Sequence, residues 1–309
     1  MRSLLRAASI VASRFGSPPS SVLNIVPSMQ QAPSSTCQVS VKVLASLVSA
    51  DDLSYIRGTA HFFKPSPSGG DVAGSSAVGI VTEVGDGVHN LSSGDHVLLI
   101  GNRGCWTDSV LAHTDNVIKL PGALSNPSQA AALPLLLSAR AILQLPGDVK
   151  RPQGDVLLAK DLDPALALAI ETVGRYDGVK VTRDVSASRG VSLAVSSRGG
   201  RAATDVIRRL GTSGVLVVVP TAQLEDHNTN VSFPIAKAIF AGVSVHGFSL
   251  PAWIAQRKRA DAMLQELWHA MDAGDLGMHS LETFQLSSIH RAVDAAEVSG
   301  ASILLVADT

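Results

Sequence analysis

The fold of this chain is decided by the stretch 70-GDVAGSSAVGIVTEVGDGVHNLSSGDHVLLIGNRGCWTDSVLAHTDNVIKLPGALSNPSQAAALPL-135. Within it, short apolar runs such as 78-VGIVTEVG and 95-DHVLLIG alternate with glycine and aspartate turns, a pattern typical of β-strands joined by tight connections. After Asn126 the pattern changes to alanine and leucine at helical spacing. Together with the strand-like run 39-VSVKVLASLV upstream, this part predicts a β-rich unit that ends in one or two helices.

Beyond Gly154 the sequence predicts a second unit of a different kind. Short, continuously apolar runs begin near residues 155, 179, 191, 215 and 243, with helical segments among them. Such runs indicate strands covered on both faces, as in a parallel α/β sheet. Only the seven residues 184–190 separate the strand ending near Arg183 from the next one, whereas a parallel crossover needs a dozen or more. We therefore expect a doubly wound parallel sheet that lacks one helix–strand unit.

Composition excludes several classes of protein. The 309 residues are 46% hydrophobic and 17% charged, which is enough apolar material for a buried core and too little charge for a disordered chain. With 25 basic and 26 acidic residues, the whole surface cannot act as a field that binds polyanions. Cys37 and Cys105 are too few for a disulfide framework and stand too far apart in sequence for a clustered zinc site.

The first residues carry a strong charge bias. Arg2, Arg6 and Arg14 all precede Asp51, which is the first acidic residue. On a helix, one apolar face would hold Leu4, Ala8, Val11 and Phe15. This pattern is typical of a mitochondrial presequence, and an ordinary surface helix remains an alternative. We expect residues 1–38 to be a presequence and linker outside the fold, and the protein to reside in the mitochondrial matrix.

Several motifs resemble one enzyme superfamily. In the deciding stretch, the order of glycines, Trp106, Lys119-Leu120-Pro121 and the Ala-Ala-Leu-Pro segment is similar to the medium-chain dehydrogenase/reductase superfamily, in its zinc-free quinone oxidoreductase branch. Three further segments resemble the mitochondrial trans-2-enoyl-thioester reductases: 52-DLSYIRG-58, 193-LAVSSRGG-200 and 246-HGFSLPAW-253. The resemblance covers about residues 39–309.

The resemblance implies an α/β protein with a β-rich GroES-like domain and a shortened Rossmann-like, doubly wound parallel sheet. We expect the GroES-like domain at 39–145, the shortened Rossmann-like domain at 146–273 and a return to the GroES-like domain at 274–309. The edge strand 242-GVSVHGF-248 matches the segment by which relatives pair across a two-fold axis. A homodimer through this strand is therefore expected.

The expected cofactor segment departs from the family pattern. Resemblance places 159-AKDLDPALALA-169 where relatives hold the pyrophosphate of a dinucleotide, with Ala165 and Ala167 at glycine positions. Asp163 followed by proline predicts an N-cap, so the helix end is satisfied by its own carboxylate. Asp161 adds a second negative charge. Both features oppose pyrophosphate binding.

Other residues matched to the family's site are equally altered. Ala60 stands where enoyl-thioester reductases carry a proton-donating tyrosine, and neither Tyr55 nor the adjacent His61 clearly replaces it. Ser138 keeps a hydroxyl at the position of a family threonine near the nicotinamide. Arg183 either faces an NADPH 2′-phosphate or is a solvated surface arginine.

These observations favour a non-catalytic mitochondrial protein with an enoyl reductase-like fold that serves as a structural subunit or assembly factor of a larger complex, with the ribosome as one candidate. We assign no catalytic, cofactor-binding or metal residue and no cofactor. The alternative is an NADPH-dependent 2-enoyl-thioester or quinone reductase. Contact with RNA is a further expectation. It rests on two basic clusters, whose simpler explanation is a solvated helix face: Arg198, Arg201, Arg208 and Arg209, and the segment 256-QRKR-259.

Overall fold

The chain divides into two compact units. The structure is a computed structural model and describes residues 8–28, 32–33, 36–59, 71–101, 103–144, 155–184, 186, 190–197, 200–219, 233–254 and 257–306. Unit 1 comprises Met1–Pro134 and His279–Thr309, and unit 2 comprises Leu135–Met278. The sequence predicts the boundaries between the two units at 145/146 and 273/274, whereas the structure has them at 134/135 and 278/279.

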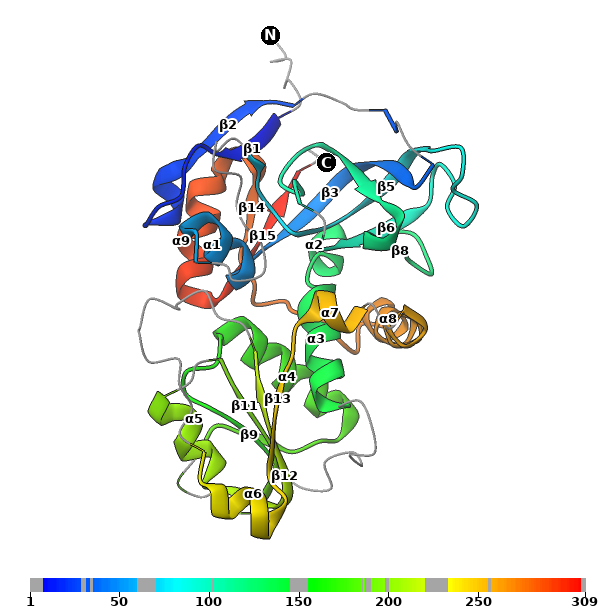
Figure 1. The fold of residues 1–309 in the computed structure, drawn as a ribbon. Coiled ribbons are helices and arrows are strands. Elements are labelled where there is room, and N and C mark those ends of the chain that lie inside the picture. The colour runs from blue at the N-terminus through cyan, green and yellow to red at the C-terminus, as the bar shows by residue number, and fades with distance from the viewer. Residues whose placement is uncertain are drawn as a thin grey trace. The chain divides into compact units, whose positions relative to one another are not determined.

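Unit 1 is built on two sheets (Figure 1). One is antiparallel, in the order β2-β1-β4; the other has the order β14-β15-β3-β5-β6-β8, with β7 paired to β3. Their strands are β1 (Ala8–Ala12), β2 (Leu23–Pro27), β3 (Gln38–Ser49), β4 (Asp71–Val72), β5 (Ser76–Val84), β6 (His96–Ile100), β7 (Ser109–His113), β8 (Val117–Lys119), β14 (Thr283–Gln285) and β15 (Ala301–Leu305). The helices are α1 (Ala50–Arg57), α2 (Pro127–Ala130), α9 (Ile289–Ser299) and the 3₁₀ turns Pro19–Val22, Thr114–Asn116 and Leu286–Ser288.

The expectation that residues 1–38 lie outside the fold is wrong for β1 and β2, which form an antiparallel hairpin in unit 1. Ile10 in β1 is fully buried. Its N–H donates to the Trp106 carbonyl, and its own carbonyl accepts from the Ala73 N–H, both at 2.8 Å. The apolar residues of this segment therefore serve as core of the unit. Arg2 and Arg6 lie outside the described residues.

Trp106, to whose backbone the hairpin is hydrogen-bonded, is itself held firmly in the core. Its ring is fully buried, and its Nε1–H donates to the Leu47 carbonyl at 3.2 Å. Gly74 lies against this ring with φ +94°, and a Cβ added there would lie 2.3 Å from the indole Cδ1. A side chain at position 74 would thus displace Trp106, because no real Cβ contact is that short.

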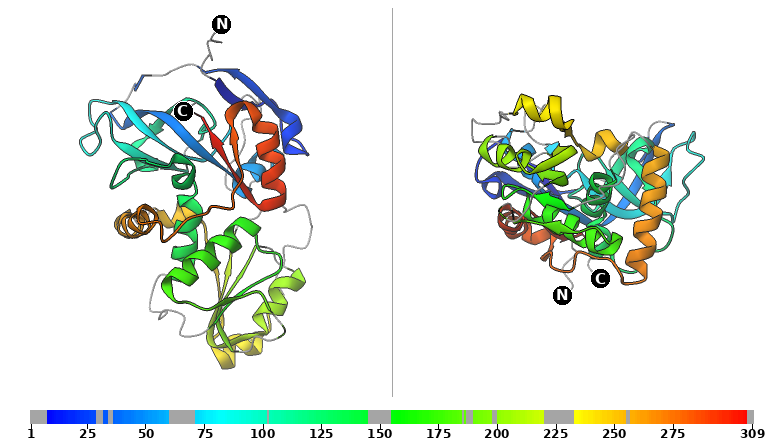
Figure 2. Two further views of the ribbon diagram at one scale, coloured as in Figure 1. Left: turned by 180° about the vertical axis from the view of Figure 1, so that it is seen from behind. Right: turned by 90° about the horizontal axis from the view of Figure 1, so that it is seen from below.

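Unit 2 confirms the predicted parallel sheet. Five strands, all parallel, lie in the order β10-β9-β11-β12-β13. They are β9 (Val156–Leu158), β10 (Val181–Thr182), β11 (Val191–Ser196), β12 (Leu210–Val218) and β13 (Ser244–Gly247). The helices are α3 (Leu133–Leu143), which begins at the unit boundary, α4 (Pro164–Asp177), α5 (Gly200–Ile207), α6 (Ile235–Ala241), α7 (Leu250–Ile254) and α8 (Arg257–Asp272). Figures 1 and 2 show α4 and α5 on opposite faces of this sheet.

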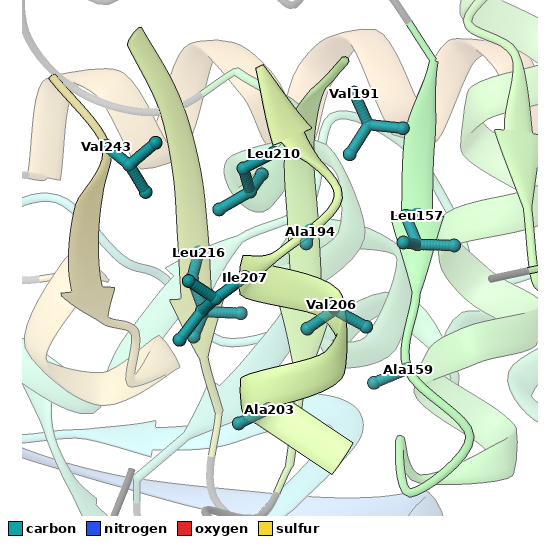
Figure 3. Packing of buried hydrophobic residues seen from close by; sticks show 10 residues of the cluster. All are labelled: Leu157, Ala159, Val191, Ala194, Ala203, Val206, Ile207, Leu210, Leu216 and Val243. Carbon is teal, nitrogen blue, oxygen red and sulfur yellow. The ribbon is translucent and has the colours of Figure 1, made fainter. Parts of the chain in front are cut away.

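The face of the sheet beneath α5 forms a dense apolar core. Ala203, Val206 and Ile207 of α5 belong to the same buried cluster as Leu157 of β9 and Leu216 of β12 (Figure 3). All five side chains are at most 1% exposed. Unit 2 thus buries a core of its own.

The missing helix–strand unit is also confirmed for the described residues, none of which forms a strand between β10 and β11. These two strands flank β9 on either side, yet only residues 183–190 connect them. A standard parallel crossover with its helix does not fit into so short a segment.

We expect Ile10→Ala to lower the free energy of unfolding by about 2–5 kcal/mol, because it leaves a cavity in the core of unit 1. Ile25→Ala, in the same hairpin but with its side chain 45% exposed, is the matched control and should cost less than about 1 kcal/mol. Urea unfolding of the full chain measures both. Equal effects would show that β1 is not part of the core.

Candidate functional site

The candidate site is the amino end of α4, directly after β9. Asp163 is the N-cap, as predicted, and Pro164 occupies the first helical position. The Asp163 Oδ1 accepts hydrogen bonds from the N–H groups of Ala165 at 3.1 Å and of Leu166 at 3.0 Å. These are two of the N–H groups that a helix end otherwise offers to an anion.

Strand β11 holds this end of the helix in place. The Asp163 N–H donates to the Ser197 Oγ at 3.1 Å, and the Ser196 Oγ donates to the Asp161 Oδ2 at 2.9 Å. Both serines are buried. Our sequence analysis missed them, although hydroxyl residues that end an apolar strand were a visible signal. Two aspartates and two serines therefore connect the carboxyl ends of β9 and β11.

The electrostatics of the site follow from burial of the cap. Burial raises the pKa of Asp163 from 3.8 to about 6, although its two backbone hydrogen bonds act in the opposite direction. At neutral pH the carboxyl group is therefore mostly ionised. Its negative charge faces the positive end of the α4 dipole, which is a favourable arrangement.

The resemblance implies that a dinucleotide would lie at this end of α4. The N–H groups of Ala165 and Leu166 already have a carboxylate partner. Ala165 and Ala167, at the positions where the resemblance implies glycine, carry buried methyl groups. A second carboxylate, that of Asp161, lies on the same connection. The residues at this end of α4 do not fit a pyrophosphate.

Arg183 has an ion-pair partner of its own. Its Nε donates to the Glu171 Oε1 at 2.5 Å and its Nη2 to the Glu171 Oε2 at 2.9 Å. This bidentate ion pair links the residue that follows β10 to α4. The side chain of Arg183 is still 53% exposed. Of the two expectations, the surface arginine agrees with this geometry, because Glu171 already neutralises the charge that a 2′-phosphate would need.

The remaining predicted residues belong to other elements or lie outside the described residues. Tyr55 belongs to unit 1, where its hydroxyl donates to Asp71 at 2.8 Å. Ser138 is partly buried in α3. Ala60 and His61, where a proton donor was sought, lie outside the described residues. The structure therefore adds no described proton donor to the candidate site.

The basic clusters are only partly described. Arg201 and Arg208 both lie within 4 Å of Asp205, at 3.9 and 3.7 Å, so one carboxylate offsets part of their charge. Arg198 and the side chains of 256–259 lie outside the described part of the chain. The geometry therefore adds no argument for RNA contact.

Metal and membrane chemistry receive no support from the described residues. These include no group of three or more His, Cys, Asp or Glu side chains that could hold a metal ion. Cys37 is exposed and Cys105 is buried, and neither forms a disulfide bond. None of the described helices has the length and hydropathy that a membrane crossing requires.

Comparisons with known proteins agree with the two units. Residues 35–122 match the alcohol dehydrogenase GroES-like domain family. The mitochondrial enoyl-[acyl-carrier-protein] reductase of Dictyostelium discoideum is 25% identical over 271 residues, covering 75% of this chain and 74% of that protein. The Xenopus tropicalis protein of the same name is 22% identical over 263 residues, covering 72% of each.

The structural comparison extends over nearly the whole chain. The mitochondrial 2-enoyl thioester reductase heterodimer from Candida tropicalis superposes with a TM-score of 0.75 at 17% identity, covering 98% of this chain and 100% of that one. The chain therefore has the fold of this reductase, with a GroES-like unit followed by a parallel α/β unit. Its sequence is similar to those of mitochondrial enoyl reductases.

These comparisons confirm the fold class and the enoyl reductase-like fold. On function they favour the reductase alternative over the non-catalytic expectation, because the relatives carry the names of reductases. They give no support to a ribosomal role, a multi-subunit assembly or RNA contact. The end of α4, where Asp163 occupies the N–H groups, is the feature of the structure that argues against the reductase alternative.

The raised pKa of Asp163 predicts a pH dependence of stability. A carboxyl whose pKa is higher in the folded protein, about 6 against 3.8, binds its proton more tightly when folded, so its contribution to stability decreases as pH rises from about 4 to 6. Asp163→Asn keeps the acceptor and removes the titration. We expect the difference in unfolding free energy between this variant and the natural chain to shift in favour of the variant across this range, as measured by urea unfolding at several pH values.

Asp163→Ala is the companion variant. It removes the cap as well as the charge, so it should cost about 0.5–2 kcal/mol relative to Asp163→Asn at every pH. A pH-independent difference between Asp163→Asn and the natural chain would contradict the burial of an ionised carboxylate.

Proposed function

We propose that this chain is a mitochondrial protein that keeps the enoyl reductase fold but does not use a nicotinamide dinucleotide, and that it acts without catalysis as a subunit or assembly factor of a larger complex. The observation that carries the proposal is the Asp163 carboxylate on the N–H groups of Ala165 and Leu166. A fold can be retained for its surface after its chemistry is lost.

Order-of-magnitude free energies support weak binding of a dinucleotide. Micromolar affinity for a dinucleotide requires about 8 kcal/mol. Losing one set of hydrogen bonds to a charged phosphate costs on the order of 1.5–3 kcal/mol, and repulsion by the carboxylates of Asp161 and Asp163 adds to this loss. The absent helix–strand unit between β10 and β11 removes surface that the resemblance assigns to the adenosine end. Together these changes move the expected dissociation constant toward millimolar.

The second candidate is an NADPH-dependent 2-enoyl-thioester or quinone reductase. The names and similarity of the relatives favour it, since both proteins of 22–25% identity are enoyl reductases. Under this candidate, Ser138 and His61 are the first residues to mutate, because they carry the polar groups nearest in sequence to the family's site positions. The cofactor experiment below separates it from the first candidate.

The mitochondrial location rests on the relatives, whose names place them in that organelle. We extend this location to the present chain, and the matrix is the compartment that fits an enoyl reductase-like protein whose two cysteines form no disulfide. The hairpin of β1 and β2 must remain attached there, because it supplies Ile10 to the core of unit 1.

Calorimetry with NADPH tests the main proposal. The purified full chain should show no saturable heat at micromolar concentrations and should not oxidise NADPH with a crotonyl thioester or a quinone. A variant with Asp163→Ser, Ala165→Gly and Ala167→Gly restores a small neutral cap and the glycines. It should gain at least about tenfold in affinity for NADPH, because backbone N–H groups become available to phosphate.

Either of two results would favour the reductase instead. A micromolar dissociation constant for the natural chain would overturn the proposal outright. Turnover of an enoyl thioester that is lost in Ser138→Ala or His61→Ala would assign the chemistry to those positions.

We further propose that the chain forms a homodimer through β13. This strand is the edge of the unit 2 sheet, and unpaired edges tend to pair with another chain. Its Val245 is 44% exposed, and nearby α6 exposes three more large apolar side chains: Ile235, Ile239 and Phe240. The related reductase from Candida tropicalis is described as a heterodimer.

We expect the full chain to elute as a dimer in light-scattering chromatography and Val245→Lys to elute as a monomer, because a lysine on the edge strand opposes pairing. Val298→Lys is the matched control. Val298 is 83% exposed on α9 in unit 1, and its replacement should leave the dimer intact. A monomeric natural chain, or a dimer that survives Val245→Lys, would contradict this interface.

A further inference from the structure

Unit 1 contains a pocket of its own. It has a volume of about 430 Å³ and opens among the β1–β2 hairpin, β4, β7 and the segment before β7. This volume lies in the range of small-molecule sites. Because all of its walls belong to one unit, the pocket does not depend on the end of α4.

A pair of opposite charges lines one side of the pocket. Arg103 and Asp71 both face it and both contact Tyr55. The Arg103 Cζ lies 4.2 Å from the centroid of the Tyr55 ring, and the Tyr55 hydroxyl donates to the Asp71 Oδ2 at 2.8 Å. Burial and the hydrogen bond to Asp71 raise the pKa of Tyr55 to about 12. Tyr55 therefore stays protonated and holds the cation and the carboxylate close together.

A chain of hydroxyl groups lines another part of the pocket. The Thr107 Oγ1 lies 2.7 Å from the Ser9 Oγ and 3.1 Å from the Ser28 Oγ. Ser9 and Thr107 are 6% and 3% exposed, so their positions are fixed by the surrounding strands. Linked hydroxyls of this kind can donate to a charged acceptor while keeping their bonds to one another.

The remaining walls are apolar. They come from the hairpin, from β4 and from β7, and consist of Val26, Pro27, Val72, Val110 and Leu111. A ligand of this pocket should therefore combine an apolar body with both signs of charge at one end. A purely anionic ligand would be repelled by Asp71, and a purely cationic one by Arg103.

We propose that the pocket binds a zwitterion with an apolar side chain, such as an aliphatic α-amino acid. Its carboxylate would lie on the Arg103 guanidinium and the hydroxyl of Ser28, and its ammonium group on the Asp71 carboxylate. The side chain would pack on Val72 and Leu111. A free amino acid and the exposed end of a peptide share parts of this chemistry, and only the free amino acid carries both charged groups on the same α-carbon.

Calorimetric titration of the full chain with leucine tests the proposal. We expect saturable binding below about 1 mM, and at least about tenfold weaker binding of leucine methyl ester, which lacks the carboxylate, and of N-acetyl-leucine, which lacks the ammonium group. These ligand comparisons use the natural chain, so they do not depend on whether a variant folds. Equal binding of N-acetyl-leucine would assign the pocket to carboxylates in general and overturn the zwitterion.

Two variants test the assignment to this pocket. Arg103→Gln and Asp71→Asn should each weaken leucine binding at least about tenfold, whereas Lys42→Gln, an exposed position on β3 outside the pocket, should not. Retained binding in both pocket variants, or no saturable binding of leucine, valine or isoleucine by the natural chain, would overturn the proposal. NADPH binding is read separately, so the outcome at α4 does not affect this one.

Discussion

The hydrogen bonds that the first turn of α4 donates to the Asp163 carboxylate determine which groups the end of this helix can still bind. They satisfy the helix end from within the chain, and the link from Asp163 to Ser197 ties that end to β11. Asp161 makes a second link to the same strand through Ser196. In a dinucleotide-binding protein a phosphate completes this end of the helix; here the Asp163 carboxylate accepts the hydrogen bonds of Ala165 and Leu166.

The altered end of α4 is compatible with an intact parallel sheet. The five parallel strands keep an order in which β9 lies between β10 and β11, and the core beneath α5 is dense (Figure 3). β10, the edge strand next to β9, contributes no residue to this cluster. The core and the end of α4 are thus built mainly from different residues of unit 2, so a substitution at one need not disrupt the other.

In unit 1, tertiary packing determines the secondary structure of residues 8–12. Leu4, Ala8, Val11 and Phe15 are spaced as on one face of a helix, and the arginines suggested targeting. Residues 8–12 nevertheless form strand β1, because Ile10 pairs with the backbone of Ala73 and Trp106. Partner strands far away in sequence supply those hydrogen bonds, and a local pattern cannot reveal them.

The sequence by itself determined the two units, the parallel sheet with its missing crossover, and the cap at Asp163, because each depends on neighbours within a few residues or on runs of apolar side chains. Only the tertiary structure decided that Glu171 neutralises Arg183, that β1 belongs to the core, and that Arg103 and Asp71 meet at Tyr55. The partners in these contacts are separated along the chain, by 96 positions for Ile10 and Trp106, whose backbones are hydrogen-bonded. Their meeting depends on how the strands are ordered, which side-chain periodicity does not specify.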